Sequence, residues 1–356
     1  MPAAITGAVQ HSPAALKQFP IVGLGASAGG LEALEKFLTH VPPDCGIGFV
    51  VVTHQHPGHT GLLPELLGKC TRMPVKLAAD GLAVEPNTVY LSLPEGYLAI
   101  MHGTLHFMEP DETGLLRLPI DFFFRSLAED QKEKAVGIVL SGTGTDGTLG
   151  LKAIKVATGM TMAQEPDSAK YSGMPSSAIA TGLVDYVLPV ERLPQRLIAY
   201  ATGPYLAATD HELGAEEGLS EPMQKILVLL RARTGHDFSN YKANTIRRRI
   251  ERRINVHQLQ GPLQYLRLLS ENPHELDLLF RELVIGVTNF FRDPDAFDAL
   301  AKAVVPEMLA AHPDNQPVRV WAAGCAKTGA FAGFVIQRNR RDYRECCDEL
   351  SDNVFS

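Results

Sequence analysis

Residues 20–30 of the chain read Pro20-Ile21-Val22-Gly23-Leu24-Gly25-Ala26-Ser27-Ala28-Gly29-Gly30. A short apolar strand therefore runs into small residues around one serine, and residues 31–38 continue with the apolar spacing of a helix. Gly25-Ala26-Ser27-Ala28-Gly29 fits the pattern G-x-S-x-G, whose glycines permit a tight turn from strand to helix that presents the serine hydroxyl at the edge of a sheet. The pattern makes Ser27 the candidate nucleophile.

The same segment allows two other interpretations. Glycine-rich turns of this kind often only close a βαβ unit. Gly23-x-Gly25-x-x-Ala28 also fits the dinucleotide-binding pattern, which requires an acidic residue after the second strand to hold the ribose. The second apolar run, 47–52, is followed by Thr53-His54-Gln55-His56 instead, and this disfavours a dinucleotide.

The composition is that of a globular protein. The chain has 356 residues, 45% of them hydrophobic, and a formal net charge of −7, so no bulk basicity indicates nucleic acid as a partner. Residues 1–18 lack the features of a secretory signal, and no apolar run approaches the ~20 residues that a membrane span needs. We therefore expect a cytoplasmic protein that is not inserted in a membrane. The five cysteines have no C-x-x-C spacing, which predicts reduced thiols.

Apolar, strand-like runs alternate with helical runs between residues 19 and 200. The strand-like runs are 20–24, 47–52, 75–77, 88–93, 136–140, 160–163 and 184–188. Several are apolar throughout, as is typical of parallel strands covered on both faces. They predict an α/β domain, residues 19–200, with a doubly wound, mostly parallel sheet. Residues 97–108, with His102-Gly103 in the middle, predict a small antiparallel hairpin added to it.

The second half of the chain has a different pattern. Residues 201–222 have the polar, glycine- and proline-containing composition of a linker. The runs 223–233, 245–256, 263–269 and 276–283 have helical spacing and predict a small all-helical domain over residues 223–300. One further strand is predicted at 318–321, and residues 1–18 and 327–356 are predicted to be disordered.

Three polar residues lie where ligands bind in an open parallel sheet, beyond the carboxyl ends of the strands. Ser27 follows the first strand, His54 follows the second, and Asp146 lies in the glycine-rich loop 141–147. A serine nucleophile needs an imidazole to take its proton, and the imidazole needs a carboxylate to orient it. The three residues can fill these roles, although their order, Ser-His-Asp, differs from the order Ser-Asp-His of α/β-hydrolases.

The small residues of the loop 142–147 predict a second part of the site. A phosphate-binding P-loop would need a lysine, which this loop lacks. Its backbone N–H groups are better suited to stabilising a developing oxyanion. The candidates for that backbone role are Thr143 and Ala28, the residue after Ser27.

The histidines near His54 leave an alternative open. His54-x-His56-x-x-His59 has the histidine spacing of binuclear zinc hydrolases, but Gly58 stands where those enzymes have an aspartate. Imidazole nitrogens alone could bind zinc, yet the predicted parallel sheet argues against that fold, and we expect no metal. His56 is also an alternative to His54 as the base, although the position at the strand end favours His54.

Residues 19–200 closely resemble the catalytic domain of the chemotaxis receptor methylesterases, the CheB family. The matching segments are 25–30, 52–54 with the following 62–67, 140–147, and 163–165 with 172–175. The resemblance implies that Ser27, His54 and Asp146 hydrolyse glutamate γ-methyl esters on receptor helices without a cofactor, and deamidation of glutamines is a related activity of that family. The implied partners are methylated chemoreceptors or related signalling proteins. The family commonly has a receiver domain in front, and residues 1–18 are too few to form one.

The helical segment resembles the N-terminal domain of the receptor methyltransferases, the CheR family, through residues 244–253 and 287–293. Thr288 and Arg292 match positions near S-adenosylmethionine. The resemblance also implies that a basic helix engages acidic receptor segments through Arg247, Arg248, Arg252 and Arg253. The alternative is that these arginines form an ordinary solvated face.

The resemblance to a methyltransferase ends near Lys327. After residues 320–326 that family continues with Thr-Gly-Glu-Glu, whereas this chain reads Lys327-Thr328-Gly329-Ala330-Phe331. Residues 301–326 are therefore interpreted as the start of an incomplete methyltransferase domain, and residues 327–356 as an aberrant tail of a truncated or frameshifted fusion. S-adenosylmethionine would bind only an intact domain. The predicted function is a serine methylesterase; the alternatives are a non-catalytic receptor-binding module and a remnant of a bifunctional methylesterase and methyltransferase.

Overall fold

The structure is a computed structural model that describes residues 19–54, 62–94, 96–108, 118–207, 219–239 and 241–284, with the short stretches 299–304, 307, 318–321 and 333–336. The chain divides into two units, residues 1–284 and 285–356. None of the described helices is long and apolar enough to cross a membrane.

A seven-stranded sheet lies at the centre of the first unit. Its strand order is β10-β9-β8-β1-β2-β5-β3, and every neighbouring pair is parallel. The strands are β1 (Ile21–Ala26), β2 (Gly48–Thr53), β3 (Val75–Leu77), β5 (Thr88–Leu91), β8 (Ala135–Val139), β9 (Met160–Gln164) and β10 (Tyr186–Leu188). All residues of β1 and β8 are buried, as expected for continuous apolar runs in a sheet covered on both faces. The predicted α/β fold is confirmed.

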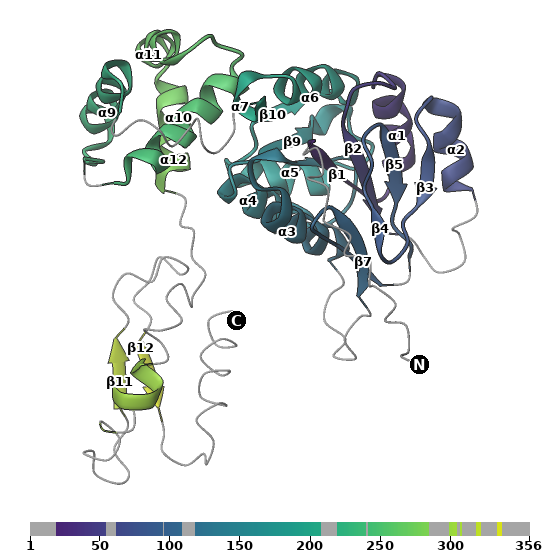
Figure 1. Cartoon of the computed structure of the whole chain (residues 1–356), viewed down its shortest axis with the longest axis horizontal. Coiled ribbons are helices and arrows are strands. Elements are labelled where there is room, and N and C mark those ends of the chain that lie inside the picture. Colours follow the sequence, from purple (N-terminus) through teal and green to yellow (C-terminus); the bar gives the residue numbers. More distant parts are fainter. Residues whose placement is uncertain are drawn as a thin grey trace, which may run out of the picture. The chain divides into compact units, whose positions relative to one another are not determined.

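Helices cover both faces of the sheet (Figure 1). On one face lie α1 (Gly30–Thr39), α2 (Leu63–Cys70) and α6 (Leu193–Ala201); on the other lie α3 (Pro119–Gln131), α4 (Thr148–Val156) and α5 (Gly173–Ala180). Glycines in β1 bring α3 close to the strand, because a Cβ at Gly23 would lie 2.6 Å from Phe124 and one at Gly25 would lie 2.5 Å from Ile120. The single-turn helices η1 (Lys132–Lys134), η2 (Pro166–Ser168) and η3 (Val190–Arg192) join these elements.

The predicted hairpin is present in a small antiparallel sheet of order β4-β7-β6. Its strands are β4 (Leu82–Ala83), β6 (Tyr97–Met101) and β7 (Thr104–Met108). His102 and Gly103 form the turn, both with positive φ, 52° and 71°. These are the backbone angles that a two-residue hairpin turn requires.

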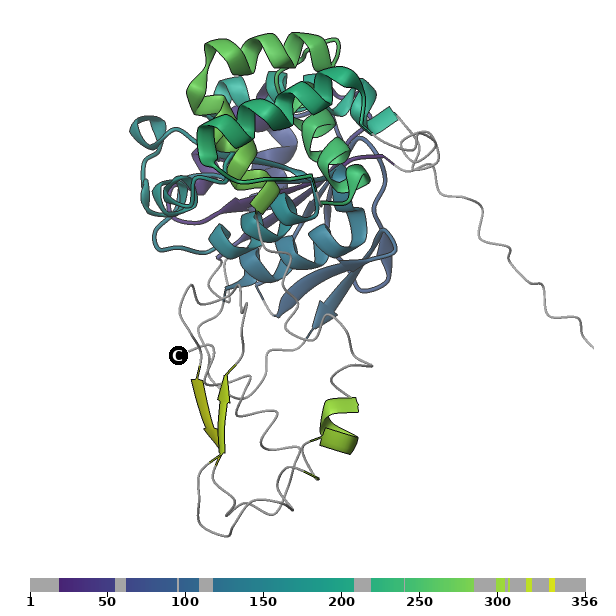
Figure 2. The ribbon, with the colours of Figure 1, turned by 90° about the vertical axis from the view of Figure 1, so that its left-hand side faces the viewer.

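The all-helical domain follows as predicted, and the first unit includes it. Its helices are α9 (Glu221–Thr234), α10 (Ala243–Val256), α11 (Pro262–Glu271) and α12 (Pro273–Val284), preceded by the short α7 (Pro204–Ala207). Figure 2 shows α9 to α12 grouped together. Their apolar stripes meet in a separate core that includes Ile226, Ile250, Tyr265 and Leu279, so each helix is fixed by burial of its apolar face.

The described residues of the second unit include a short helix, η4 (Leu300–Val304), and the strands β11 (Val318–Trp321) and β12 (Gly333–Ile336). The strand predicted at 318–321 is β11, and it pairs antiparallel with β12. Because β12 lies within residues 327–356, the prediction of disorder is wrong for residues 333–336. The apolar pattern of the tail is too weak to predict a strand. In the structure, the backbone of β12 forms its hydrogen bonds by pairing with β11.

Candidate active site

Ser27 lies in the turn between β1 and α1. Its N–H donates a hydrogen bond to the Ser141 carbonyl oxygen at 3.0 Å, and its own carbonyl accepts one from Gly30 N–H at 2.8 Å. The turn requires glycine, because Gly29 has a φ of +70° and a Cβ at Gly30 would lie 2.7 Å from the Ala26 Cβ. The local sequence therefore holds the Ser27 hydroxyl at the carboxyl edge of the sheet.

His54 follows β2 and faces Ser27. In the β1–β2 register Ala26 pairs with Thr53. Ser27 and His54, the residues that follow this pair, therefore lie side by side. The His54 Nδ1 atom lies 3.0 Å from Ser27 Oγ, and Nε2 lies 2.8 Å from Asp146 Oδ2. The imidazole is 33% exposed whereas Asp146 is 2% exposed, so the three groups run from the surface into the protein.

The two nitrogens of His54 have exchanged the roles they have in the serine-protease template, where Nε2 faces the serine. A carboxylate only accepts hydrogen bonds. The tautomer that satisfies the network therefore carries its proton on Nε2, donates it to Asp146, and leaves Nδ1 free to accept from Ser27.

Asp146 is held by backbone donors around its whole carboxylate. Oδ2 accepts from Ile120 N–H at 3.0 Å, and Oδ1 accepts from Asp121 N–H at 2.8 Å and Gly147 N–H at 2.9 Å. Two of these donors belong to the first turn of α3, where unpaired N–H groups and the helix dipole favour a negative charge. The sequence analysis found Asp146 but did not predict that the start of α3 lies beside it. Pro119 was an available signal for this helix start, because proline is common at the first position of a helix.

The loop after β8 packs closely against Ser27. A Cβ at Gly142 would lie 3.0 Å from the Ser27 Cβ and would collide with the Met174 sulfur. Ser141 joins this loop to the serine turn, because its hydroxyl donates to the Ala28 carbonyl oxygen at 2.9 Å and accepts from Tyr171 N–H at 3.0 Å. The supporting roles of Ser141, Tyr171 and Met174 were not predicted from the sequence.

The two predicted oxyanion residues, Ala28 and Thr143, flank this packed region. Thr143 is exposed and Ala28 is half-buried. Within the described part of the chain, neither backbone N–H donates a hydrogen bond. Both donors are therefore available to a ligand, but their role in binding an oxyanion stays a prediction.

A small cavity of about 100 Å³ lies next to His54. Its lining includes His54, Thr53, Leu93, Pro94, Tyr97 and Pro119. Most of this lining is apolar, so the cavity suits a small group with little polarity.

Several predicted residues lie outside the described residues: His56, His59, Thr288 and Arg292. Among the residues that are described, no group of three or more His, Cys, Asp or Glu side chains could hold a metal ion. Cys45 and Cys70 are free thiols.

The structure corrects the predicted receptor contacts of the basic helix, α10. Arg252 is 0% exposed and donates to Asp185 and to Glu282, while Arg253 is buried against Glu275. The prediction that Arg252 and Arg253 contact a receptor is therefore wrong, because both guanidinium groups are enclosed in ion pairs within the chain. Arg247 is also buried, and only the half-buried Arg248 retains some exposure.

Two family comparisons divide the chain in the same order as the sequence analysis. Residues 22–197 match the family described as CheB methylesterase. Residues 221–284 match the all-alpha domain of the CheR methyltransferases.

Known proteins match parts of the chain. An "uncharacterized 104.1 kDa protein in hypE 3'region" of Rhodobacter capsulatus is 37% identical over 284 residues, which are 74% of this chain and 30% of that protein. "Protein-glutamate methylesterase/protein-glutamine glutaminase 4" of Burkholderia thailandensis is 34% identical over 200 residues, 56% of this chain and 58% of that protein. The chain thus spans between about a third and somewhat more than half of these relatives.

A solved structure also matches. It is the crystal structure of the Thermotoga maritima CheB methylesterase catalytic domain, whose sequence is 33% identical to this chain. The match covers 51% of this chain and 97% of that one, with a TM-score of 0.48.

Proposed function

The chain carries a domain of the CheB methylesterase family followed by a CheR-type all-alpha domain, and from this premise we propose that it hydrolyses glutamate γ-methyl esters on chemotaxis or related signalling receptors. The observation that carries the proposal is the continuous hydrogen-bonded line from Ser27 through His54 to Asp146 at the carboxyl edge of the sheet. A nucleophile, a base and an orienting carboxylate are the groups that acyl transfer to serine requires.

In the proposed reaction, His54 Nδ1 takes the hydroxyl proton while Ser27 Oγ attacks the ester carbonyl carbon. The negative charge that develops on the carbonyl oxygen is stabilised by the backbone N–H groups of Ala28 and Thr143. The imidazolium then protonates the leaving methoxide, which departs as methanol. Water, deprotonated by the same imidazole, attacks the acyl-enzyme and releases the glutamate. Every step uses side chains or backbone groups, so we propose that the esterase needs no cofactor.

The environment of Asp146 supports this mechanism. Its carboxylate accepts hydrogen bonds from three backbone N–H groups and from His54. These hydrogen bonds fix the carboxylate in place, so that it orients His54 and stabilises the imidazolium that forms during catalysis.

The small cavity beside His54 supports a methyl ester as the substrate. The leaving methoxy group must lie close to the imidazole that protonates it. The mostly apolar lining can accommodate a methyl group. An amide nitrogen could leave by the same route, so deamidation of glutamine is a second proposed activity, in keeping with the "protein-glutamine glutaminase" in the relatives' names.

The proposed partners are methylated receptors on the cytoplasmic side. The alternative is a module that binds a receptor without catalysis. A serine reagent separates the two, because it reacts only with an activated serine.

A fluorophosphonate reagent is expected to label the full chain at Ser27, and mass spectrometry of the digested protein identifies the modified peptide. The Ser27→Ala variant should take up no label. Ser177 serves as the control, since its hydroxyl donates to the Gly144 carbonyl in the same region and, among the described residues, bonds to no histidine; Ser177→Ala should be labelled like the wild type. Absence of label on the folded wild-type chain would favour the binding module.

A further inference from the structure

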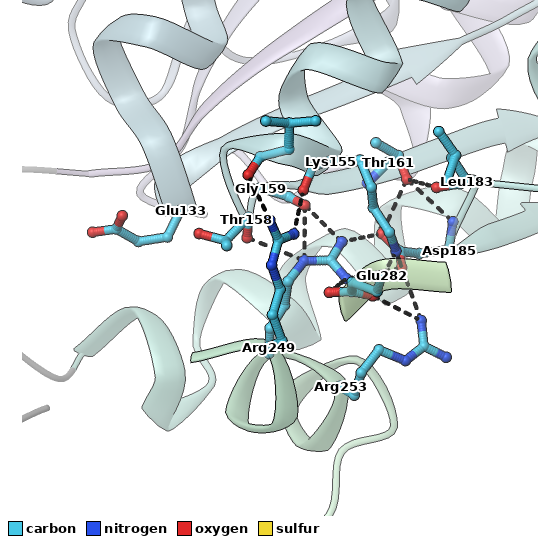
Figure 3. Close-up of polar contacts among 12 residues, drawn as sticks. Glu133, Lys155, Thr158, Gly159, Thr161, Leu183, Asp185, Arg249, Arg253 and Glu282 are labelled. Atoms are coloured by element: carbon cyan, nitrogen blue, oxygen red, sulfur yellow. Dashed lines mark hydrogen bonds and ion pairs between the residues drawn. The ribbon is translucent and has the colours of Figure 1, made fainter. Parts of the chain in front are cut away.

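The helical domain contacts the esterase domain through arginines of α10, which bind the C-terminal end of α4 (Figure 3). Arg249 donates from Nη1 to the Lys155 carbonyl oxygen at 2.9 Å and from Nη2 to the Val156 carbonyl oxygen at 3.0 Å. Arg252 donates from Nε to the carbonyl oxygens of Thr158, at 3.1 Å, and Gly159, at 3.0 Å. These acceptors belong to the last turn of α4 and to the residues that follow it.

Such contacts add to the hydrogen bonds at the C-terminal end of α4, where the Lys155 carbonyl also accepts from Thr158 N–H at 3.1 Å. The last four carbonyl groups of a helix lack partners within it and carry a partial negative charge. A guanidinium group answers both needs, because it is cationic and presents several donors in one plane. In the described part of the chain Arg249 forms no salt bridge, and its hydrogen bonds go to α4 alone. Its main role is therefore to cap this helix.

A buried cluster of charged side chains fixes the same junction. Lys155, in α4, lies 2.6 Å from Asp185 and 3.0 Å from Glu282 of α12. Arg252 and Arg253 each pair with Asp185 as well. Burial alone would raise the pKa of Asp185, but the neighbouring Arg252, Lys155 and Arg253 hold that pKa well below its usual range.

A third carboxylate, Glu275, extends the cluster within the helical domain. Burial again opposes ionisation of Glu275, but hydrogen bonds from His257 and Arg253 lower its pKa to about 2. Asp185 and Glu275 are thus ionised at neutral pH, and the pairs of Lys155, Arg252 and Arg253 with the buried carboxylates tie α4 to α10 and α12 by side chains as well as by backbone.

The other end of α4 begins at the proposed catalytic carboxylate. Gly147 directly follows Asp146, donates to its Oδ1 at 2.9 Å, and accepts at its own carbonyl from Leu151 N–H at 2.9 Å. Gly150 N–H donates to Asp121 Oδ1 at 2.6 Å, and Asp121 N–H donates to Asp146 at 2.8 Å. The first turn of α4 and the Asp146 carboxylate therefore share one hydrogen-bond network.

We propose that Arg249 is a positioning residue of the esterase: by capping the C-terminal end of α4, the helical domain holds the N-terminal end of that helix, and with it Asp146, against His54. The two ends are joined by a single helix of 9 residues, about 13 Å long, whose packing against α3 leaves little freedom between them. The consequence for catalysis rests on the function proposed above. The helical domain would then contribute to esterase activity by keeping Asp146 in place.

The test compares Arg249→Met, Arg249→Lys and, as control, Arg231→Met in the full chain. Arg231 is an exposed arginine of α9 that pairs with Asp237 at 3.2 Å. Hydrogen exchange measured by mass spectrometry should accelerate several-fold in Arg249→Met at both ends of α4, including the amide of Leu151. The rate of Ser27 phosphonylation should fall about three- to tenfold, the range expected for coupling through a packed element. Arg249→Lys should recover part of this loss, since its ammonium can donate to the same carbonyls, and Arg231→Met should match the wild type.

Each outcome decides the proposal. Faster exchange confined to residues 155–159, or an unchanged phosphonylation rate despite faster exchange along α4, would overturn it, because Arg249 would then serve the junction only. If Arg249→Met does not fold, the phosphonylation rate of Arg249→Lys decides alone, and a rate equal to that of the wild type counts against the proposal. If wild-type Ser27 takes no label, the proposed function fails, and the exchange of α4 still shows whether its two ends are coupled.

Discussion

Replacing His54 with glutamine is expected to lower the rate of ester hydrolysis by at least about three orders of magnitude. The imidazole is the only group in the described site that contacts both Ser27 and Asp146, and glutamine cannot take the hydroxyl proton or return it to the leaving group. The fold should persist, because the side chain is partly exposed. Steady-state hydrolysis and thermal unfolding of the same preparations measure the two effects.

A matched control is present in the hairpin. His106 is 34% exposed and its Nδ1 lies 3.5 Å from Asp80, so it resembles His54 in exposure and in having a carboxylate beside it. Unlike His54, it bonds to no serine among the described residues. His106→Gln should retain full activity. His56→Gln should also remain active if His54 is the base. Retained activity in His54→Gln would show that His54 is not the base. If, in addition, His56→Gln lost activity about a thousandfold, His56 would be the base.

Replacing Arg252 with methionine is expected to destabilise the first unit by about 3–5 kcal/mol. The guanidinium is fully buried and lies between Asp185 and Glu282, at 2.8 Å from the latter. Methionine preserves much of the volume but leaves two buried carboxylates with one cation fewer. Urea unfolding at neutral pH measures the change in the free energy of unfolding.

The comparison variant is Arg233→Met. Arg233 pairs with Asp277 at 3.2 Å, but both side chains are exposed, and such surface pairs contribute about 0–1 kcal/mol. A loss in Arg252→Met no larger than in Arg233→Met would mean that the buried cluster does not hold the two domains together.

The sequence predicted the sheet and the place of the candidate site for a physical reason. Continuous apolar runs specify strands buried on both faces, and parallel strands bring the residues after them to one edge. Ser27 and His54 could therefore be placed together once β1 and β2 were recognised. The sequence could not predict that His54 turns Nδ1, rather than Nε2, toward Ser27, because this depends on side-chain geometry within the turn.

The burial of the α10 arginines could not be predicted either. The isoleucines of this helix, at 246, 250 and 254, form a stripe that packs into the helical core, and the basic residues on its other side look like a solvated face. Their partners Asp185 and Glu282 lie far away in the sequence. Only the docking of the helical domain on α4 reveals that a second face of α10 is covered.

The most direct test of the central claim is methanol release from receptor membranes that carry radiolabelled methyl esters, measured for the full chain and its Ser27→Ala variant. The proposed mechanism predicts release by the wild type and a loss of at least about a thousandfold in the variant. Equal release by both, or none by a folded wild-type chain, would contradict the claim that this site is a serine methylesterase.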